Sequence, residues 1–527
     1  MLLNSATSMP SAVRRLIAAL SFKHSFLLAL VSGAANLFAF APFYCWPIQI
    51  LSLSVLLLLV MQREQDAIKH QSVLVWAYGF SWLVTGFGWL VIALARYGEL
   101  PWLLSIIAIA LLAALLALFL PCAFYGACIL QRRWNSPASV FLLGIFPAFF
   151  VIAEWLRAWV FTGFPWASSG YTHTASWLAG FAPLIGVYGI GWLNALIAGA
   201  LSLALLDRTT AIKMALFVGG VFFSGFLLQK IEWTKPQGQP IQVRLLQGNI
   251  DQGIKFDANH LRSTLDLYQS LITKEPADLI ATPETALPIL SSDLPPNYLS
   301  DLQFFALQSH SKLILGVVLH DGDARYSNSV IGLGGANAAS FYRYDKHHLV
   351  PFGEFVPYGF RWFTNLMQIP LGDLSSAGLY QQPMQVKDQY VMPNICYEDV
   401  FGEEIAAQLA AQYAAKEPVA SILLNVSNLA WYGDSTAIPQ HLQISTMRVL
   451  ETGRPMLRAT NTGATAVINA KAQVVAELKP LTQGSLNTSV QGMKGMTPYI
   501  VLGNSTILLI CIISLLLAYL LSRKYRH

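Results

Sequence analysis

Three reactive side chains each follow a short β-rich run of this sequence: Glu284, Lys346 and Cys396. Acyl transfer needs a nucleophile, a base that takes its proton, and a cation or hydrogen-bond donors that stabilise the oxyanion. Cysteine is the strongest of the common nucleophiles once it is ionised, and a carboxylate takes the thiol proton if burial raises the pKa of that carboxylate. A lysine stabilises both the thiolate and the oxyanion. These residue types therefore predict acyl-transfer chemistry at strand ends, where layered α/β folds carry their active sites.

Each of the three residues also has a simpler explanation when it is taken alone. Glu284 could cap a helix in solvent, Lys346 could be a surface cation, and Cys396 could be a small core residue. Cys396 is the only cysteine in the stretch 233–497, so its thiol has no disulfide partner there and is either inert or a nucleophile. The other four cysteines lie in apolar runs: Cys45, Cys122, Cys128 and Cys511.

The composition of the chain is that of a membrane protein. Of its 527 residues, 55% are hydrophobic and 12% are charged, whereas soluble domains carry about 25% charged residues. The net charge of +5 is small, and no basic run interleaved with aromatic residues favours nucleic-acid binding. Eight apolar stretches are candidates for membrane spans: 25–41, 46–62, 73–94, 102–130, 138–157, 183–206, 212–229 and 499–521.

Basic residues in the short loops predict the orientation of these spans, because such residues concentrate on the cytoplasmic side. Eight spans put both termini in the cytoplasm and turn residues 233–497 outward, into the periplasm of a bacterial inner membrane. The opposite short loops offer little beyond Arg96 and Arg157. The cytoplasmic set is Arg14, Arg15, Lys23, Arg63, Lys69, Arg132, Arg133, Arg208, Lys213, Arg523, Lys524 and Arg526.

We therefore expect three parts: a transmembrane domain at 1–232 with about seven helices, a catalytic domain at 233–497, and a C-terminal helix with a cytoplasmic tail at 498–527. The first apolar run leads directly into further spans, without a small-residue cleavage site, so it is not predicted to be a signal peptide.

Strands and helices alternate in the middle stretch, which indicates a layered α/β or α+β domain. About 250 residues can bury a large core without disulfides. The predicted strands are 241–246, 278–281, 312–319, 327–333, 340–344, 390–395, 421–426 and 464–469. The predicted helices are 258–274, 298–309, 401–415 and 437–452. The apolar stretch 351–375, rich in aromatics, glycine and proline, is either a core segment or an arm that dips into lipid.

The sequence around the three residues resembles the nitrilase superfamily, in which Glu, Lys and Cys follow strands in that chain order. Residues 281–288 read Ala-Thr-Pro-Glu-Thr-Ala-Leu-Pro, residues 344–357 contain Asp-Lys-His-His-Leu-Val-Pro-Phe-Gly-Glu, and residues 394–399 read Asn-Ile-Cys-Tyr-Glu-Asp. The wider match resembles the apolipoprotein N-acyltransferase family, the membrane-embedded branch of that superfamily. It extends over blocks that begin at Phe161, Gln247, Ser427 and Arg448.

This resemblance implies a polytopic α-helical membrane domain of about eight helices joined to a four-layer αββα sandwich. It implies Glu284 as the general base, Lys346 as the stabiliser of the oxyanion and thiolate, and Cys396 as the nucleophile. Glu354 is expected to orient Lys346 or the incoming amine, and Glu398 to support the lysine or its loop. Each of these two acids could instead be a solvated carboxylate.

Further candidates surround these residues. Asn428 is expected to support the site, and Tyr397, Phe355, Trp431, Trp233 and His347 are candidates for substrate contacts. Trp233 could equally anchor the chain at the membrane interface. His347 and His348 could touch a phosphate headgroup or lie exposed in a loop. Glu154 and Arg157 could form a plain ion pair or meet a lipid headgroup.

The chain departs from the family pattern at two positions. Leu429 stands where the family usually has Asp, and Thr282 stands where a Trp commonly precedes Pro-Glu-Thr. Neither departure affects Glu284, Lys346 or Cys396. They put in doubt any detailed account of the pocket wall near Leu429.

The resemblance implies a two-step reaction in which Cys396 accepts an acyl chain from a phospholipid, usually phosphatidylethanolamine, and passes it to the α-amine of a lipoprotein's diacylglyceryl-cysteine. We expect no metal, no organic cofactor and no nucleic acid to bind. We expect the protein to be a monomer. Two alternatives remain open: a membrane-tethered amidase that hydrolyses a small C–N substrate, and a transporter or lipid-binding scaffold with a degenerate soluble domain.

Overall fold

The computed structural model describes residues 17, 19–63, 67–322, 325–335, 341–359, 361 and 374–524. The chain divides into two compact units. One comprises Met1–Val91, Leu103–Ile231 and Leu502–His527, and the other comprises Ile92–Trp102 and Glu232–Val501. Residues 360 and 362–373 of the stretch 351–375 lie outside the described residues, as do Arg14, Arg15 and Arg526.

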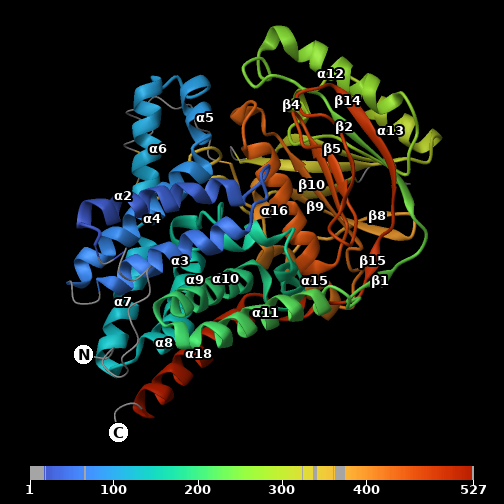
Figure 1. The fold of residues 1–527 in the computed structure, drawn as a ribbon. Coiled ribbons are helices and arrows are strands. Elements are labelled where there is room, and N and C mark those ends of the chain that lie inside the picture. Colours follow the sequence, from blue (N-terminus) through green and yellow to red (C-terminus); the bar gives the residue numbers. More distant parts are fainter. Residues whose placement is uncertain are drawn as a thin grey trace. The chain divides into compact units, whose positions relative to one another are not determined.

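The first unit is helical. Six of its described helical segments are long and apolar enough to cross a membrane, or seven if a pair bent by 58° counts as one span. The six are Phe22–Ala39, Trp102–Trp134, Ala138–Arg157, Trp177–Leu206, Arg208–Leu228 and Ser505–Lys524. Its main helices are α2 (Phe22–Ala35), α3 (Pro47–Gln62), α4 (Ile68–Phe87), α6 (Trp102–Leu116), α7 (Phe119–Trp134), α9 (Phe146–Arg157), α10 (Ala182–Leu206), α11 (Ala211–Leu228) and α18 (Ser505–Lys524), and α5 (Leu90–Arg96) leads into the second unit (Figure 1).

All eight predicted apolar stretches are helical, but they do not form eight equal spans. The stretch 73–94 is the bent pair, α4 followed by α5. The stretch 46–62 becomes α3, which has 16 residues and is therefore about 24 Å long at 1.5 Å per residue. The hydrocarbon core of a bilayer is about 30 Å thick. Six of the eight stretches, or seven with the bent pair, are thus long and apolar enough to cross a membrane, and α3 is the shorter eighth.

Glu154 and Arg157 organise a loop of this helical unit. Both are buried. The Glu154 carboxylate accepts hydrogen bonds from the backbone N–H and the hydroxyl of Ser169, each at 2.7 Å. The Arg157 guanidinium donates to the carbonyl oxygens of Phe164 and Trp166, each at 2.8 Å. The two charges thus fix the chain between α9 and α10 from inside the protein.

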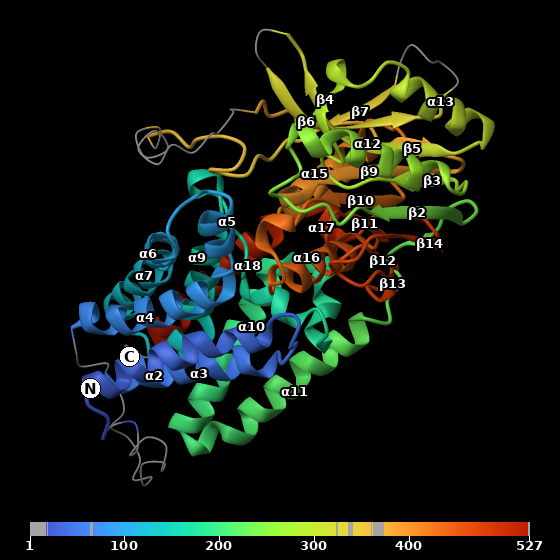
Figure 2. The ribbon, with the colours of Figure 1, turned by 90° about the horizontal axis from the view of Figure 1, so that it is seen from above.

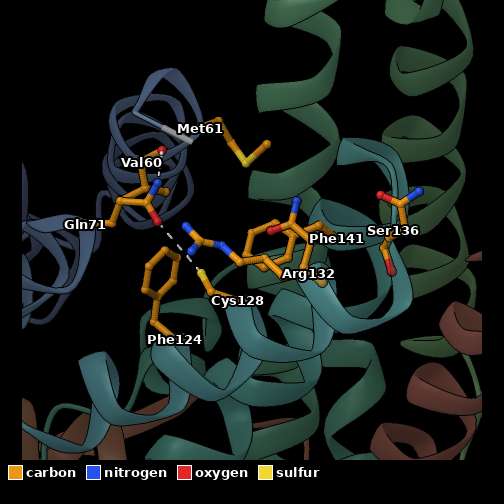
Figure 3. Close-up of a pocket in the computed structure, with 10 residues that line it drawn as sticks. Val60, Met61, Gln71, Phe124, Cys128, Arg132, Ser136 and Phe141 are labelled. Atoms are coloured by element: carbon orange, nitrogen blue, oxygen red, sulfur yellow. Dashed lines mark hydrogen bonds between the residues drawn. The ribbon is translucent and has the colours of Figure 1, made fainter. Parts of the chain in front are cut away.

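The helical unit also contains a cavity of about 220 Å³. Figure 3 shows the Cys128 thiol pointing toward Gln71 in this cavity, and the sulfur lies 4.0 Å from the Gln71 amide oxygen. The lining residues are Val60, Met61, Gln71, Phe124, Cys128, Gln131, Arg132, Asn135, Ser136 and Phe141. None of the three predicted catalytic residues is among them.

The second unit is built on two large sheets. The seven-stranded sheet has the order β14-β2-β3-β5-β6-β7, with β4 paired to β5, and the six-stranded sheet has the order β13-β12-β11-β10-β9-β8. The first contains β2 (Ile241–Gln247), β3 (Leu279–Ala281), β4 (Leu287–Leu290), β5 (Lys312–His320), β6 (Tyr326–Leu333), β7 (Tyr342–Asp345) and β14 (Gly484–Val490). The second contains β8 (Met384–Val386), β9 (Gln389–Ile395), β10 (Ile422–Ser427), β11 (Met456–Thr460), β12 (Ala466–Ile468) and β13 (Val474–Glu477). A further two-stranded sheet pairs β1 (Lys235–Pro236) with β15 (Met493–Lys494).

Alternating side chains of these strands build two apolar cores. Leu313 and Leu315 of β5 pack with Leu302 of α13 (Tyr298–Gln308), whereas Ile314 joins a cluster with Val391 of β9 and strands of the other sheet. Helix α12 (Ala258–Thr273) lies beside α13, while α15 (Gly402–Ala414) and α16 (Ala437–Thr452) cover the second sheet. Figure 2 shows α13 and α16 on opposite sides of the paired sheets. The predicted αββα sandwich is confirmed.

Strand direction determines where the site lies. Strands β3 and β5 are parallel, β6 runs antiparallel to β5, and β7 runs antiparallel to β6. The carboxyl ends of β3 and β7 therefore meet at one edge of their sheet. Strand β9 runs parallel to β10, which is parallel to β11.

Candidate active site

Three strand ends deliver the predicted catalytic residues. Lys346 directly follows β7 and Cys396 directly follows β9, while Glu284 lies three residues beyond β3. The turn that carries Glu284 is fixed by β5: the Thr282 hydroxyl accepts the Gly316 N–H at 2.9 Å. Thr282, which stands where a Trp was expected, is thus part of the turn's support.

Glu284, Lys346 and Glu354 form one buried ionic cluster. The Lys346 ammonium is 1% exposed and donates to a Glu284 oxygen at 3.3 Å and to the Glu354 carboxylate at 2.9 Å. Burial alone would lower the pKa of Lys346, but Glu354 and Glu284 together raise it well above the ordinary value. Lys346 is therefore held as a cation, and Glu354 is in place to orient it.

Asn328, in β6, ties the two carboxylates together. Its side-chain amide donates to Glu284 at 2.8 Å and to Glu354 at 2.7 Å. Sequence analysis missed this residue. A signal was present, because asparagine is depleted from strands and Asn328 sits inside a β-rich run.

The pKa of Glu284 moves in the opposite direction to the one expected for a base raised by burial. Burial does favour its neutral form, but Lys346, the Asn328 amide and Lys255 outweigh burial and lower the pKa of Glu284 below its ordinary value. The backbone N–H of Asn428 also donates to this carboxylate at 3.0 Å. Glu284 is therefore ionised at neutral pH.

Cys396 occupies a strained turn directly after β9. Its φ of 52° lies in the left-handed region, which costs a non-glycine residue about 1–3 kcal/mol. The Asn425 side chain donates to the Cys396 carbonyl at 3.2 Å and helps to hold this turn. Burial, followed by the negative charge of Glu284, raises the pKa of the thiol well above its ordinary value, although Lys346 lowers it.

These opposite pKa shifts define the resting state of the site. The thiol is neutral and the neighbouring carboxylate is ionised. The arrangement thus differs from a preformed thiolate ion pair.

Glu398 braces the loop that follows Lys346. Its carboxylate accepts the backbone N–H groups of Ile395 and His347, each at 2.6 Å, and the Tyr344 hydroxyl at 3.0 Å. It thereby ties the end of β7 to the end of β9. Of the two roles expected for Glu398, the geometry matches support of the loop.

Asn428 joins the site to the loop after β2. Its side-chain amide donates to the Gln252 side chain at 2.7 Å, and its oxygen accepts from Asn461 at 3.0 Å. The neighbouring Leu429 is 1% exposed and belongs to the apolar core. The hydrophobic side chain at this position is therefore buried away from water.

The remaining candidates are distributed unevenly. Tyr397 and His348 pack against Phe401, with ring centroids 5.2 and 3.5 Å away. A ring nitrogen of His347 lies 2.7 Å from the Ala377 carbonyl oxygen. Phe355 is half-buried beside the loop that carries Glu354.

Two tryptophans lie in different surroundings. Trp431 is 39% exposed and meets the ring of Tyr97 edge-on at 5.5 Å within the same unit. Trp233 adjoins Thr234, which donates to Gly453 at the amino end of β11. That edge is opposite to the strand ends that carry Cys396, so the fold does not bring Trp233 to the site.

A second buried lysine, Lys255, was also missed. It comes from the loop after β2, and its ammonium donates to the Glu284 carbonyl at 3.2 Å and to the Thr285 hydroxyl at 2.6 Å. Nothing in a loop sequence marks a lysine as buried.

Within the described residues, no group of three His, Cys, Asp or Glu side chains could hold a metal ion.

Two family models match this chain. The apolipoprotein N-acyltransferase N-terminal domain matches residues 32–200, and the carbon-nitrogen hydrolase model matches residues 242–493. The second match covers the strand ends described above.

Curated relatives match nearly the full length. An apolipoprotein N-acyltransferase of Ralstonia nicotianae is 44% identical over 95% of this chain and 93% of its own length. Those of Nitrosomonas europaea and Chromobacterium violaceum are 42% and 40% identical, over 93% and 95% of this chain and 96% and 94% of their own lengths. With both domain models matched in order and full-length relatives well above 30% identity, this chain belongs to the apolipoprotein N-acyltransferase family, the acyltransferase branch of the carbon-nitrogen hydrolases.

Proposed function

We propose that this enzyme transfers an acyl chain from a phospholipid to a lipoprotein through a thioester on Cys396. In the first step the Cys396 proton passes to Glu284 while the sulfur attacks the carbonyl carbon of the phospholipid ester. Lys346 stabilises the negative charge that develops on the carbonyl oxygen. The ester C–O bond then breaks, the leaving oxygen takes the proton from Glu284, and lysophospholipid departs.

The second step reverses these roles on an amine. The α-amine of the lipoprotein's diacylglyceryl-cysteine attacks the thioester carbon, and Glu284 takes a proton from the nitrogen. The C–S bond breaks, and the proton returns from Glu284 to the Cys396 sulfur. The products are an N-acylated lipoprotein and the free enzyme.

The observation that carries this proposal is the buried cluster of Glu284, Lys346 and Glu354 beside Cys396 in a chain with membrane-spanning helices. Moving an acyl chain from a bilayer into water costs about 0.8 kcal/mol per CH₂ group, or about 12 kcal/mol for a sixteen-carbon chain. An enzyme whose two substrates both keep their acyl chains in lipid avoids that cost.

Family and apolar helices together make this a bacterial inner-membrane protein. For its topology we propose a periplasmic catalytic domain and cytoplasmic termini, from the distribution of basic residues in the short loops. For its donor we propose phosphatidylethanolamine, and for its oligomeric state a monomer.

The amidase alternative is not favoured. A nitrilase-type amidase would share the Glu–Lys–Cys cluster, but it would not require the spanning helices or the N-terminal domain that this chain shares with its acyltransferase relatives.

The test of the proposal uses phospholipid with a radiolabelled acyl chain and the full-length protein in detergent. Wild-type protein should acquire label that hydroxylamine releases, and the Cys396→Ala variant should acquire none. Normal lipoprotein acylation by Cys396→Ala would overturn the proposal. Glu284→Gln should block thioester formation; if it slows only the transfer to the amine, Glu284 is not the base of the first step.

A further inference from the structure

The loop after β2 buries two polar side chains and exposes two apolar ones, which is the reverse of the usual arrangement. Gln252 and Lys255 are 5% and 3% exposed, whereas Ile254 and Phe256 are 38% and 59% exposed. Burying an ammonium group costs free energy unless it is paired, so such an inversion needs compensation from neighbouring groups. Both buried side chains turn toward the site: Gln252 accepts from Asn428, and Lys255 donates into the Glu284 turn.

Lys255 donates hydrogen bonds to the turn that carries Glu284. Its ammonium bonds to the carbonyl of Glu284 and to the hydroxyl of Thr285, and Thr285 has a φ of 45° in the left-handed region. Gly316 closes the other side, where an added Cβ would lie 2.1 Å from the Pro283 carbonyl oxygen. The turn is therefore clamped between β5 and the Lys255 ammonium.

Lys346 and Lys255 differ in the charge of the groups that accept their hydrogen bonds. Lys346 lies against two carboxylates. The two acceptors of Lys255 are neutral oxygens, and burial lowers its pKa to about 8 even though Glu284 and Cys396 raise it. Lys255 faces Glu284, from the turn after β3, and Cys396, from the end of β9, with Lys346 and Glu354 beyond them.

Charge balance gives Lys255 a role in the reaction. Glu284 and Glu354 carry two negative charges, and Lys346 alone supplies one positive charge. Passage of the thiol proton to Glu284 moves a negative charge onto the sulfur and leaves the total unchanged. Without Lys255 the buried site would therefore hold a net charge of −1 throughout this step, which is costly at low dielectric. With Lys255 protonated, the cluster of two carboxylates and two ammonium groups is neutral before the thiol proton moves.

We propose that Lys255 is a positioning residue for Glu284 and the second cation that keeps the site neutral while Cys396 becomes acylated. The inference rests on the proposed function, because it assigns Lys255 to the thioester-forming step. It acts through Glu284 and its turn, without contact to the substrate.

The experiment measures single-turnover acylation of the full-length enzyme by phospholipid with a radiolabelled acyl chain, over a range of phospholipid concentrations and pH. Lys255→Met removes the charge and the hydrogen bonds, Lys255→Gln removes only the charge, and Lys255→Arg keeps it. Lys312→Met is the matched control, since the Lys312 ammonium also donates to a backbone carbonyl, that of Gly334, at 2.6 Å. Thermal melting of each variant reports its fold.

We expect Lys255→Met and Lys255→Gln to lower the maximal acylation rate about 100-fold, the size of effect that removal of one stabilising group typically has. The half-saturating phospholipid concentration should stay within about threefold. Lys255→Arg should retain the rate within about tenfold, and Lys312→Met should match the wild type. Wild-type acylation should decline above about pH 8, and Lys255→Arg should lack this decline because arginine stays protonated.

Three results would overturn the inference: acylation by Lys255→Met within threefold of the wild type, full recovery in Lys255→Gln, or a wild-type rate that holds through pH 9.5. The last result needs no variant, so it decides the question even if a substitution prevents folding. Absence of any thioester in the wild type would instead overturn the proposed function itself. A thioester that forms equally in the wild type and Lys255→Met removes only the role of Lys255.

Discussion

At the scale of single residues, the site combines an ionised Glu284 carboxylate with a neutral Cys396 thiol. Lys346 and Asn328 hold Glu284 as a carboxylate, while burial keeps the Cys396 thiol neutral. We expected burial to raise the pKa of the Glu284 carboxylate. The hydrogen-bond donors and cations around Glu284 reverse that expectation, because each of them favours the charged form.

The lowered pKa of Glu284 predicts the acid side of the pH profile. A base must be deprotonated to act, so a pKa below 4.5 leaves Glu284 competent throughout the weakly acidic range. Single-turnover thioester formation should therefore stay constant from pH 7 to about pH 5 and fall only below about pH 4.5. A decline centred near pH 6 would show that Glu284 is not held as the structure indicates.

The bridging amide of Asn328 leads to a second prediction. Asn328→Leu keeps the approximate size but removes the donor shared by Glu284 and Glu354. Hydrogen bonds to charged groups contribute about 1.5–3 kcal/mol, so thioester formation should slow about 100-fold. Asn487→Leu is the control, since the Asn487 amide also donates to a carboxylate, that of Glu275, at 3.1 Å but on an exposed surface. Equal rates for the two variants would contradict the account.

At the scale of elements, the site depends on how strand ends and turns are held. The Glu284 turn packs against β5 at Gly316, where a Cβ would also lie 2.7 Å from the Thr285 backbone nitrogen. Gly335, by contrast, has open space around the position of an added Cβ.

Gly316→Ala should therefore displace the Glu284 turn, at a cost of about 1–3 kcal/mol for overpacking, and reduce thioester formation about 100-fold. Gly335→Ala should leave both activity and the melting temperature unchanged. Activity assays and thermal melting of the two variants check this. A fully active Gly316→Ala protein would mean that the turn tolerates movement.

The sequence predicted the elements better than it predicted their partners. All eight expected strands of the catalytic unit form within about two residues, because each is an apolar run between turn residues. Seven described strands were missed, namely β1, β4, β8, β11, β13, β14 and β15. In β11 the buried Arg458 interrupts the apolar pattern. Glu284, Lys346 and Cys396 could be selected as candidates because they follow strands, whereas Lys255 lies in the loop after β2 and only the folded chain brings it to them.

At the scale of the whole molecule, all eight predicted apolar stretches are helical, but only six of them, or seven with the bent pair, meet the length and hydropathy expected of a membrane span. Helix α3 is short, and the α4–α5 pair is bent. Hydropathy reports where a chain is apolar, and it does not report where a helix bends or how far it extends. Basic residues beside the stretches remain the basis for the predicted orientation.

That orientation predicts the accessibility of single cysteines. Lys471→Cys, in the catalytic unit, should react with a membrane-impermeant maleimide in spheroplasts, and Arg208→Cys, between α10 and α11, should react only after lysis. Both positions are exposed in their own units. Labelling of Arg208→Cys in intact spheroplasts would contradict a cytoplasmic position for that loop.

The central claim is that the transferred acyl chain passes through Cys396. The most direct measurement is mass spectrometry of the peptide that contains Cys396, first after incubation with phospholipid and then after a chase with a diacylglyceryl lipopeptide. We predict a mass increase of one acyl group on this peptide, which disappears in the chase while the lipopeptide gains the same mass as an amide. Acylated lipopeptide formed without any modification of the Cys396 peptide, or by the Cys396→Ala variant, would contradict the account.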